Sequence, residues 1–298
     1  MNTVTVLLST FNGGKFLREQ LDSLLAQTGV KVNIFIRDDG STDNTAEILR
    51  EYESRQQLSW YQGQNKGWAM SFMELVSKAP DSDFYAFCDQ DDVWQQDKLS
   101  RAVGKIEESG RENVLYFSNL TSWRSGMEEG LVKGDFHFDR YTSLVMCQAY
   151  GCTMVFDRAL MMLLRNHMPD SVAAHDYWVY LTASFFSTLI YDEQSRILYR
   201  QHGTNQVGSQ NRMSEVLKRR YNLFFHRNSR FRHDLQAETF LSLYQDILSD
   251  EDKYAVRLVA DYRKSLKNKL ALIADKRIWT GMRRHDVVFV TKIILSLI

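Results

Sequence analysis

The sequence predicts an α/β fold with a mostly parallel central sheet, helices on both of its faces, and a helical extension at the C-terminus. Short apolar runs alternate with amphipathic helical patterns from the start of the chain to about residue 118, and from about Ser214 onward the pattern is helical. Strands that alternate with helices need crossover connections, which favour parallel pairing and place helices on both faces. We therefore expect an α/β domain over residues 1–210 and a basic helical region over residues 211–298.

The first half of the chain carries the clearest strand and helix patterns. Residues 4–8 form a short apolar run typical of a buried parallel strand, and residues 15–27 place their apolar side chains on one face of a helix that Gly29 ends. A strand at 32–36 precedes a helix at 46–52, for which residues 41–43 offer good N-caps. We then expect a strand at 58–62, a helix ending near residue 78, a strand at 84–88 and a helix at 97–108.

The second half is less regular, and residues 111–150 carry no pattern from which we predict an element. Strands are expected at 151–156, 189–191 and 197–199, and a helix at 175–184. The three cysteines, Cys88, Cys147 and Cys152, lack zinc-site spacing and lie among apolar residues. We interpret them as small buried side chains of a protein from a reducing compartment.

Charge is distributed unevenly, although the formal net charge is zero. Residues 211–298 hold 18 Lys and Arg against 10 Asp and Glu, a balance of +8, which leaves −8 for the rest of the chain. A basic region suggests anionic lipid or nucleic acid as a partner, with Lys218-Arg219-Arg220 and Arg283-Arg284 as the candidate clusters. The aromatic residues there have the spacing of a core, so nucleic acid is the weaker alternative. The apolar end at 287–298 is shorter than the roughly 20 residues that span a bilayer; it lies in a membrane interface or packs in a core or an oligomer.

Three carboxylates follow the predicted strand at 84–88, in the run Asp89-Gln90-Asp91-Asp92. Like charges so close repel one another unless a cation is present, and carboxylate oxygens suit Mg²⁺ or Mn²⁺. A solvated acidic turn is the alternative. Ligands of parallel sheets bind at the carboxyl ends of the strands, which favours the metal site.

Two further polar clusters follow predicted strands. Asp38-Asp39 ends the strand at 32–36, where a carboxylate can accept a hydrogen bond from a pyrimidine N3–H and Phe11 offers a ring for stacking. A turn and helix cap is the alternative for these aspartates. Asp176 opens the helix expected at 175–184, where an acidic residue also suits the helix dipole. Arg200 and His202 follow the strand at 197–199, and a structural role for the histidine is the alternative there.

Six sequence blocks follow one another in order along residues 4–208. They are Val6-Leu7-Leu8-Ser9-Thr10-Phe11-Asn12-Gly13, Arg37-Asp38-Asp39-Gly40-Ser41-Thr42-Asp43, Phe87-Cys88-Asp89-Gln90-Asp91-Asp92-Val93-Trp94, Gly151-Cys152-Thr153-Met154, His175-Asp176-Tyr177-Trp178 and Tyr199-Arg200-Gln201-His202-Gly203. In this order the blocks resemble the family-2 inverting glycosyltransferases, which have the Rossmann-like GT-A fold. The blocks around Asp89 and His202 further resemble bacterial rhamnosyltransferases of polysaccharide biosynthesis.

The resemblance implies a role for each site residue. Asp176 would be the general base, with His175-Asp176 standing where the family more often has Glu-Asp. Asp91, Asp92 and His202 would hold the Mg²⁺ or Mn²⁺ ion. The nucleotide sugar would be bound by Ser9, Phe11, Asn12, Asp39, Asp89, Gln90 and Arg200. One departure affects the donor site: Ser71 precedes Phe72 where the family often has Asn before an aromatic residue.

The resemblance also implies a function, the transfer of L-rhamnose from dTDP-β-L-rhamnose to a lipid-linked saccharide acceptor. Two alternatives remain: the same fold with a UDP-hexose or UDP-N-acetylhexosamine donor, and a protein that binds a nucleotide sugar without catalysis. The basic C-terminal region would hold the enzyme to the inner leaflet of the plasma membrane, on its cytoplasmic face, or would form a homo-oligomer contact.

Overall fold

The computed structural model describes residues 1–124, 127–131, 138–202, 232–281 and 283–296, which form two compact units. Unit 1 comprises Met1–Gly134, Ala149–Met168 and Ala174–Gly203. Unit 2 comprises Thr204–Ile298 together with two short segments, Asp135–Gln148 and Pro169–Ala173. The basic cluster at 218–220 lies outside the described residues, whereas Arg283-Arg284 begins a helix of unit 2.

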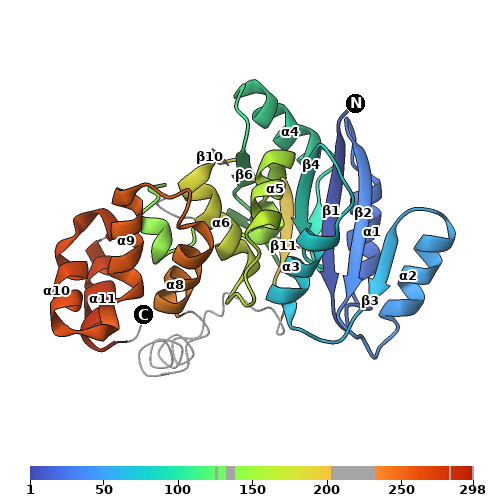
Figure 1. The fold of residues 1–298 in the computed structure, drawn as a ribbon. Helices are drawn as coiled ribbons and strands as arrows, with labels where there is room; N and C mark the ends of the chain where they lie inside the picture. The colour runs from blue at the N-terminus through green and yellow to red at the C-terminus, as the bar shows by residue number, and fades with distance from the viewer. Residues whose placement is uncertain (125–126, 132–137, 203–231, 282, 297–298) are drawn as a thin grey trace. The chain divides into compact units, whose positions relative to one another are not determined.

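Unit 1 is built on a seven-stranded sheet with the strand order β10-β6-β9-β4-β1-β2-β3 (Figure 1). All neighbours in it pair in parallel, except that β9 runs antiparallel to both β4 and β6. This confirms the predicted, mostly parallel sheet. The strands are β1 (Thr3–Thr10), β2 (Lys31–Asp38), β3 (Ser59–Gln62), β4 (Phe84–Cys88), β6 (Val114–Ser118), β9 (Val155–Asp157) and β10 (Thr188–Asp192).

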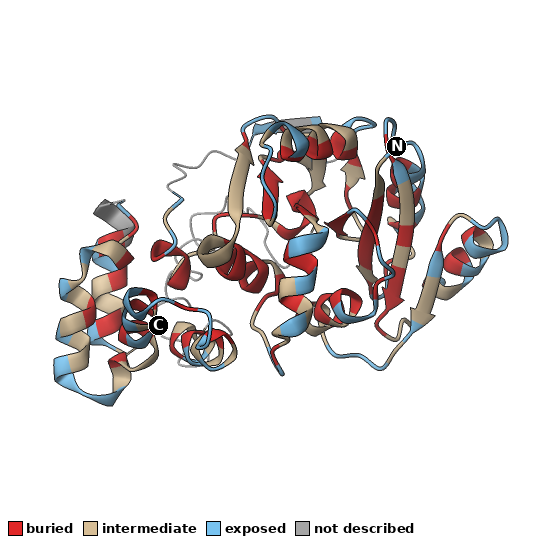
Figure 2. Cartoon of the chain, turned by 45° about the horizontal axis from the view of Figure 1, so that its top comes forward, coloured by how far each residue is buried: buried red, intermediate tan, exposed pale blue. Residues whose placement is uncertain are grey.

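Helices cover both faces of this sheet, as predicted. On one face α3 (Trp68–Lys78), α5 (Arg158–Asn166) and α6 (His175–Phe186) contact one another. On the other, α1 (Leu17–Leu25), α2 (Thr45–Ser54) and α4 (Lys98–Glu108) share a core with the strands. Successive residues of a strand point to opposite faces of the sheet, which allows helices to pack on both. In β1, the alternate residues Val4, Val6 and Leu8 all belong to the core shared with α1, α2 and α4. Figure 2 shows the buried residues concentrated in the strands and on the inner sides of the helices.

A second, four-stranded sheet has the order β5-β11-β7-β8. It joins β5 (Val93–Trp94) to β11 (Ile197–Arg200) in antiparallel register, and β11 to β7 (Thr121–Arg124) in parallel. Its fourth strand is β8 (Met127–Leu131). The region at 111–150, for which no element was predicted, therefore contains β6, β7 and β8 and a 3₁₀ turn at Thr142–Leu144. The strand predicted at 151–156 is wrong at its start, where Gly151–Thr153 forms a 3₁₀ turn and β9 begins only at Val155.

Unit 2 is helical in its described residues, which confirms the predicted C-terminal extension. Phe240, Tyr244 and Tyr262 are fully buried, and Ser249 and Ser265 cap two of the helices with their side chains. No helix in the described ranges is both long and apolar enough to cross a bilayer. The helices are α8 (His233–Tyr244), α9 (Asp250–Ala260), α10 (Leu266–Ala274) and α11 (Arg283–Ile294), with 3₁₀ turns at Tyr262–Lys264 and Lys276–Ile278.

Candidate active site

The acidic loop begins where β4 ends, at the carboxyl edge of the sheet, and leads into β5. Because β5 pairs with β11, the end of β11 comes to lie against the loop. The backbone N–H of Arg200 donates to Oδ1 of Asp92 at 3.1 Å, and its Nε donates to the carbonyl oxygen of Asp91 at 2.8 Å. Residues about 110 positions apart in sequence are thus joined at one edge of unit 1.

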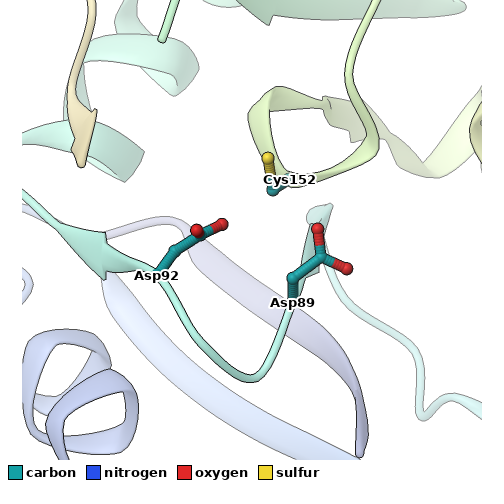
Figure 3. Close-up of side chains that lie close together, drawn as sticks. All are labelled: Asp89, Asp92 and Cys152. Atoms are coloured by element: carbon teal, nitrogen blue, oxygen red, sulfur yellow. The ribbon is translucent and has the colours of Figure 1, made fainter. Parts of the chain in front are cut away.

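Asp89 and Asp92 face each other across the loop, together with Cys152 from the neighbouring 3₁₀ turn (Figure 3). One oxygen of each carboxylate and the Cys152 sulfur all lie within 4.8 Å of one another. Burial and the surrounding carboxylates raise the pKa of Asp89 to about 7 and that of Asp92 well above its usual value. Burial likewise raises the pKa of the Cys152 thiol well above its usual value, so the sulfur stays protonated.

The donor set fits a hard divalent cation. Asp92 is completely buried, and its Oδ2 has no hydrogen-bond partner among the described residues. A buried carboxylate oxygen without a partner is costly, and two carboxylates that repel each other are stabilised by a cation between them. Oxygen ligands suit Mg²⁺ and Mn²⁺, whereas a protonated thiol is a poor ligand for either.

The other two predicted metal ligands, Asp91 and His202, contact each other at the rim of the loop. Nε2 of His202 and Oδ2 of Asp91 are 2.7 Å apart. The His202 ring stacks on Phe16 at a centroid distance of 4.9 Å, and the Arg200 guanidinium lies between the rings of Phe16 and Trp123, at 4.7 and 4.1 Å. Aromatic packing therefore holds both residues of the last block beside the acidic loop.

Asp176 lies in the first turn of α6 and joins the same acidic group. Its Oδ1 accepts the N–H of Tyr177 at 2.8 Å, and its carboxylate also accepts the N–H of Gly151. Burial raises the pKa of Asp176 to about 6, and its negative charge contributes to the raised pKa of Asp89. The carboxylate predicted to act as a base therefore lies close to the loop predicted to bind the metal ion and the nucleotide sugar.

Asp39 is buried at the end of β2, where hydrogen bonds hold its carboxylate. Oδ1 accepts the N–H of Lys66 and Oδ2 that of Gly67, each at 3.0 Å, and Oδ1 also accepts from Nη1 of Arg37. A carboxylate has about four lone-pair positions, so one remains for a ligand. Ser9 donates to Oγ of Ser71 at 2.6 Å, next to the same arginine.

The remaining predicted residues shape the loop after β1. Gln90 accepts from Oγ1 of Thr10 at 2.6 Å and from the N–H of Phe11 at 2.9 Å. Asn12 has a positive φ of 49° and accepts the N–H of Thr42 at 2.8 Å. The ring of Phe11 is 44% exposed and free to stack with a ligand. Gln90 and Asn12 thus hold this loop in place, and their direct contact with a nucleotide sugar remains a prediction.

Two residues of the site were not predicted, Arg37 and Cys152. The sequence carried a signal for Arg37, because an arginine directly after the apolar run of β2 needs a buried acidic partner. Cys152 lies in one of the six family blocks, but no role was assigned to it; it reaches the site through the 3₁₀ turn before β9.

Comparison with known proteins identifies the family. The sequence model described as glycosyl transferase family 2 matches residues 5–161, more than half of the chain. The dTDP-rhamnosyl transferase RfbG of Shigella flexneri is 29% identical over 222 residues, which cover 68% of this chain and 74% of RfbG.

Solved structures agree on the fold. TarS of S. aureus in complex with UDP-GlcNAc superposes with a TM-score of 0.59 at 16% identity, covering 99% of this chain and 91% of that one. The mannosyltransferase PcManGT of Pyrobaculum calidifontis, in complex with GDP-Man and Mn²⁺, gives 0.55 at 18% identity, covering 99% and 80%. The fold is thus of the predicted GT-A type, and the chain belongs to glycosyl transferase family 2.

Proposed function

We propose that this family-2 glycosyltransferase transfers L-rhamnose, with inversion, from dTDP-β-L-rhamnose to a lipid-linked saccharide during synthesis of a cell-surface polysaccharide such as O-antigen, capsule or rhamnan. The observation that carries the proposal is Asp176, a carboxylate with a pKa of about 6 beside the acidic loop. The 29% identity to a dTDP-rhamnosyl transferase supports the choice of sugar.

In the proposed reaction, Asp176 acts as the general base for the acceptor hydroxyl. The acceptor hydroxyl attacks the anomeric carbon from the side opposite the leaving dTDP, and the Asp176 carboxylate takes the hydroxyl proton. Inversion of a β-L-rhamnosyl donor gives an α-L-rhamnoside. A positioned base of suitable pKa contributes about 10²–10⁴-fold to such a step.

Asp91, Asp92 and His202 would hold the Mg²⁺ or Mn²⁺ ion, and Arg200 would lie near the diphosphate. Asp89 would join the metal ligands, because one of its carboxylate oxygens lies within 4.8 Å of one of Asp92. A divalent ion bound there neutralises negative charge on the leaving diphosphate. At the other end of the donor, the free lone pair of Asp39 would accept the thymine N3–H, and Phe11 would stack on the base.

Donor hydrolysis across a panel of nucleotide sugars, with Mn²⁺ present and absent, tests the donor. We expect dTDP-rhamnose to be turned over fastest. A preference for a UDP-hexose or UDP-N-acetylhexosamine would replace the rhamnose assignment while keeping the transferase. The UDP-GlcNAc complex of TarS is the observation that keeps this alternative open.

Asp176→Asn tests catalysis against simple binding. The amide keeps the size of the side chain but cannot accept the proton, so we expect transfer to fall by about 10²–10⁴-fold while the donor still binds. Asp81→Asn, at an exposed carboxylate, is the control. Transfer at the wild-type rate in Asp176→Asn would favour a nucleotide-sugar-binding protein without catalysis, or a different base.

We further propose that the basic region at 211–298 holds the enzyme to the inner leaflet, where a lipid-linked acceptor would be presented. Its positive balance supports this, because each Lys or Arg near anionic lipid contributes about 1 kcal/mol. A homo-oligomer contact through the C-terminal helices is the rival explanation.

A further inference from the structure

His175, the residue before the proposed base, is buried in an aromatic cluster. The residue is only 4% exposed. The ring stacks on Phe72 of α3 at a centroid distance of 3.9 Å and an interplanar angle of 22°. It also meets Phe87 and Trp68 edge to face, at 4.8 and 5.5 Å. Three aromatic residues therefore restrict this one ring.

The polar atoms of the ring are not used inside the protein. Neither Nδ1 nor Nε2 of His175 has a hydrogen-bond partner among the described residues. Burial lowers its pKa to about 3, so the ring is neutral at any working pH. A buried polar atom without a partner costs about 1–3 kcal/mol, so an apolar side chain would fill this space at lower cost. Packing energy alone does not explain a histidine here.

Gly151 shows what the ring does. A Cβ built on Gly151 would lie 2.7 Å from Nε2 of His175 and 3.2 Å from Cβ of Asp176. The ring edge therefore occupies the space beside Gly151 that a Cβ would need, and the N–H of Gly151 donates to the Asp176 carboxylate.

We propose that His175 is a positioning residue for the base: held by Phe72, Phe87 and Trp68, its ring sets the Gly151 backbone and so the orientation of the Asp176 carboxylate. This inference rests on the proposed role of Asp176. A displacement of about 1 Å at a reacting group lowers the rate by up to about 10²-fold, so the effect is large enough to measure.

His175→Leu tests the proposal. We expect kcat for transfer to fall about 10–100-fold, while the donor KM and the dissociation constant of dTDP with Mn²⁺ stay within about twofold of wild type. Phe156→Leu is the matched control, since Phe156 is buried, its ring lies tilted against that of Phe87 at 5.3 Å, and the change likewise replaces a buried ring with leucine. We expect it to lower the thermal stability and to leave kcat unchanged, which separates loss of core packing from loss of positioning.

Gly151→Ala is a second variant, in case His175→Leu folds poorly. Its Cβ would displace the same ring from the other side, so we again expect a loss of kcat with little change in KM. Gly104→Ala is its control, because a Cβ there meets nothing within 4 Å.

The double variant His175→Leu/Asp176→Asn separates positioning from general damage. If the ring acts through Asp176, the histidine change should lower the residual rate of Asp176→Asn no further. A fall by the same 10–100-fold in that background, or a wild-type kcat in both His175→Leu and Gly151→Ala, would overturn the inference. Transfer at the wild-type rate by Asp176→Asn would overturn both this inference and the proposed base. A wild-type kcat in His175→Leu and Gly151→Ala alone would overturn only this inference, so the two failures are distinguishable.

Discussion

Individual carboxylates of the site have raised pKa values for different reasons. Asp176 is raised to about 6 by burial alone, and its backbone hydrogen bonds pull in the opposite direction. Asp89 is raised to about 7 by burial first and then by the charges of Asp91 and Asp176. The pKa of Asp176 suits a group that exchanges a proton near neutral pH. The pKa of Asp89 suits a metal ligand that loses its proton when a cation binds.

The pKa of Asp176 predicts an acid limb in the pH–rate profile. A general base must be deprotonated, so kcat should fall tenfold per pH unit below about pH 6 as the carboxylate gains its proton. Steady-state transfer between about pH 4.5 and 8 measures the limb. Circular dichroism at each pH must show that the protein stays folded. A flat profile down to about pH 5 would exclude Asp176 as the base.

The pKa of Asp89 predicts that cation binding depends on pH. Asp89 must lose its proton to bind Mn²⁺, so the affinity should fall about tenfold between pH 8 and pH 6. In the metal-free protein the native state keeps protons that the unfolded chain releases near pH 4. Its free energy of unfolding should therefore decrease as the pH rises from about 4 to 7, and added Mn²⁺ should offset that loss.

Electron paramagnetic resonance of free Mn²⁺ measures this affinity, and thermal unfolding measures the stability. Asp89→Asn should bind Mn²⁺ weakly at both pH values, because no proton remains to be displaced. Equal Mn²⁺ affinity of the wild type at pH 6 and pH 8 would show that the Asp89 carboxylate is not part of the cation site.

The sequence predicted which carboxylates form the candidate site, but not their partners. Asp39 and Asp89 follow predicted strands, which placed them at one edge of a sheet, whereas Asp176 was expected at the start of a helix. The contact between Asp89 and Cys152, or between Gly151 and His175, depends on distances between segments more than 20 residues apart. No local pattern encodes such distances, so these contacts emerge only from the packed fold.

At the scale of elements, α3 links the two ends of the proposed donor site. Ser71 contacts Arg37 beneath Asp39, and Phe72 on the next position stacks on His175. Arg37 joins β2 to this helix: it is 1% exposed, pairs with Asp39, and lies 3.5 Å from Glu74 of α3. The position of α3 would thus affect both the proposed contact to the nucleotide base and the proposed catalytic base, Asp176.

Arg37→Met should therefore destabilise unit 1 strongly. Removing one partner of a buried ion pair leaves the other charge uncompensated, which typically costs about 3–5 kcal/mol. Urea unfolding measures the free energy, and binding of dTDP should weaken in parallel. Arg55→Met is the control, since its ion pair with Glu51 is exposed and should contribute only about 0–1 kcal/mol. Equal effects of the two changes would contradict a structural role for Arg37.

Length alone did not decide which elements were predicted, because the four-residue strands β3 and β11 were expected whereas the nine-residue helix α5 and the five-residue strand β6 were not. The helices α1 to α4 and strands β1 to β4 were expected because each repeats one pattern over several residues. A two-residue strand such as β5 has no period, and β9 is recognised only from its pairing. The antiparallel direction of β9 depends on its pairing with β4 and β6, so the sequence predicted the sheet without an antiparallel strand at this position.

For the molecule as a whole, the uneven charge of the chain leads to the remaining prediction, which concerns membrane binding by the basic region at 211–298. The helices α10 and α11 add an apolar surface to the basic region, because Leu266 is 73% exposed, Leu270 58%, Val287 63% and Ile294 60%. Apolar side chains beside basic ones are typical of a helix that lies in a membrane interface. The same side chains would also suit a contact between two copies, so the salt dependence of binding has to decide.

Binding to vesicles of phosphatidylglycerol and phosphatidylethanolamine should depend on both charge and apolar surface. Co-sedimentation should weaken as NaCl rises, and Lys267→Glu, at an exposed lysine of α10, should weaken it several-fold, at about 1 kcal/mol per basic residue. Leu270→Ser should weaken it at every salt concentration. Lys31→Glu, an equal charge change at the exposed start of β2, should leave binding unchanged. Vesicle binding that changes neither with NaCl concentration nor in Lys267→Glu would contradict the membrane proposal. Sedimentation velocity would then show whether Leu270→Ser instead separates an oligomer.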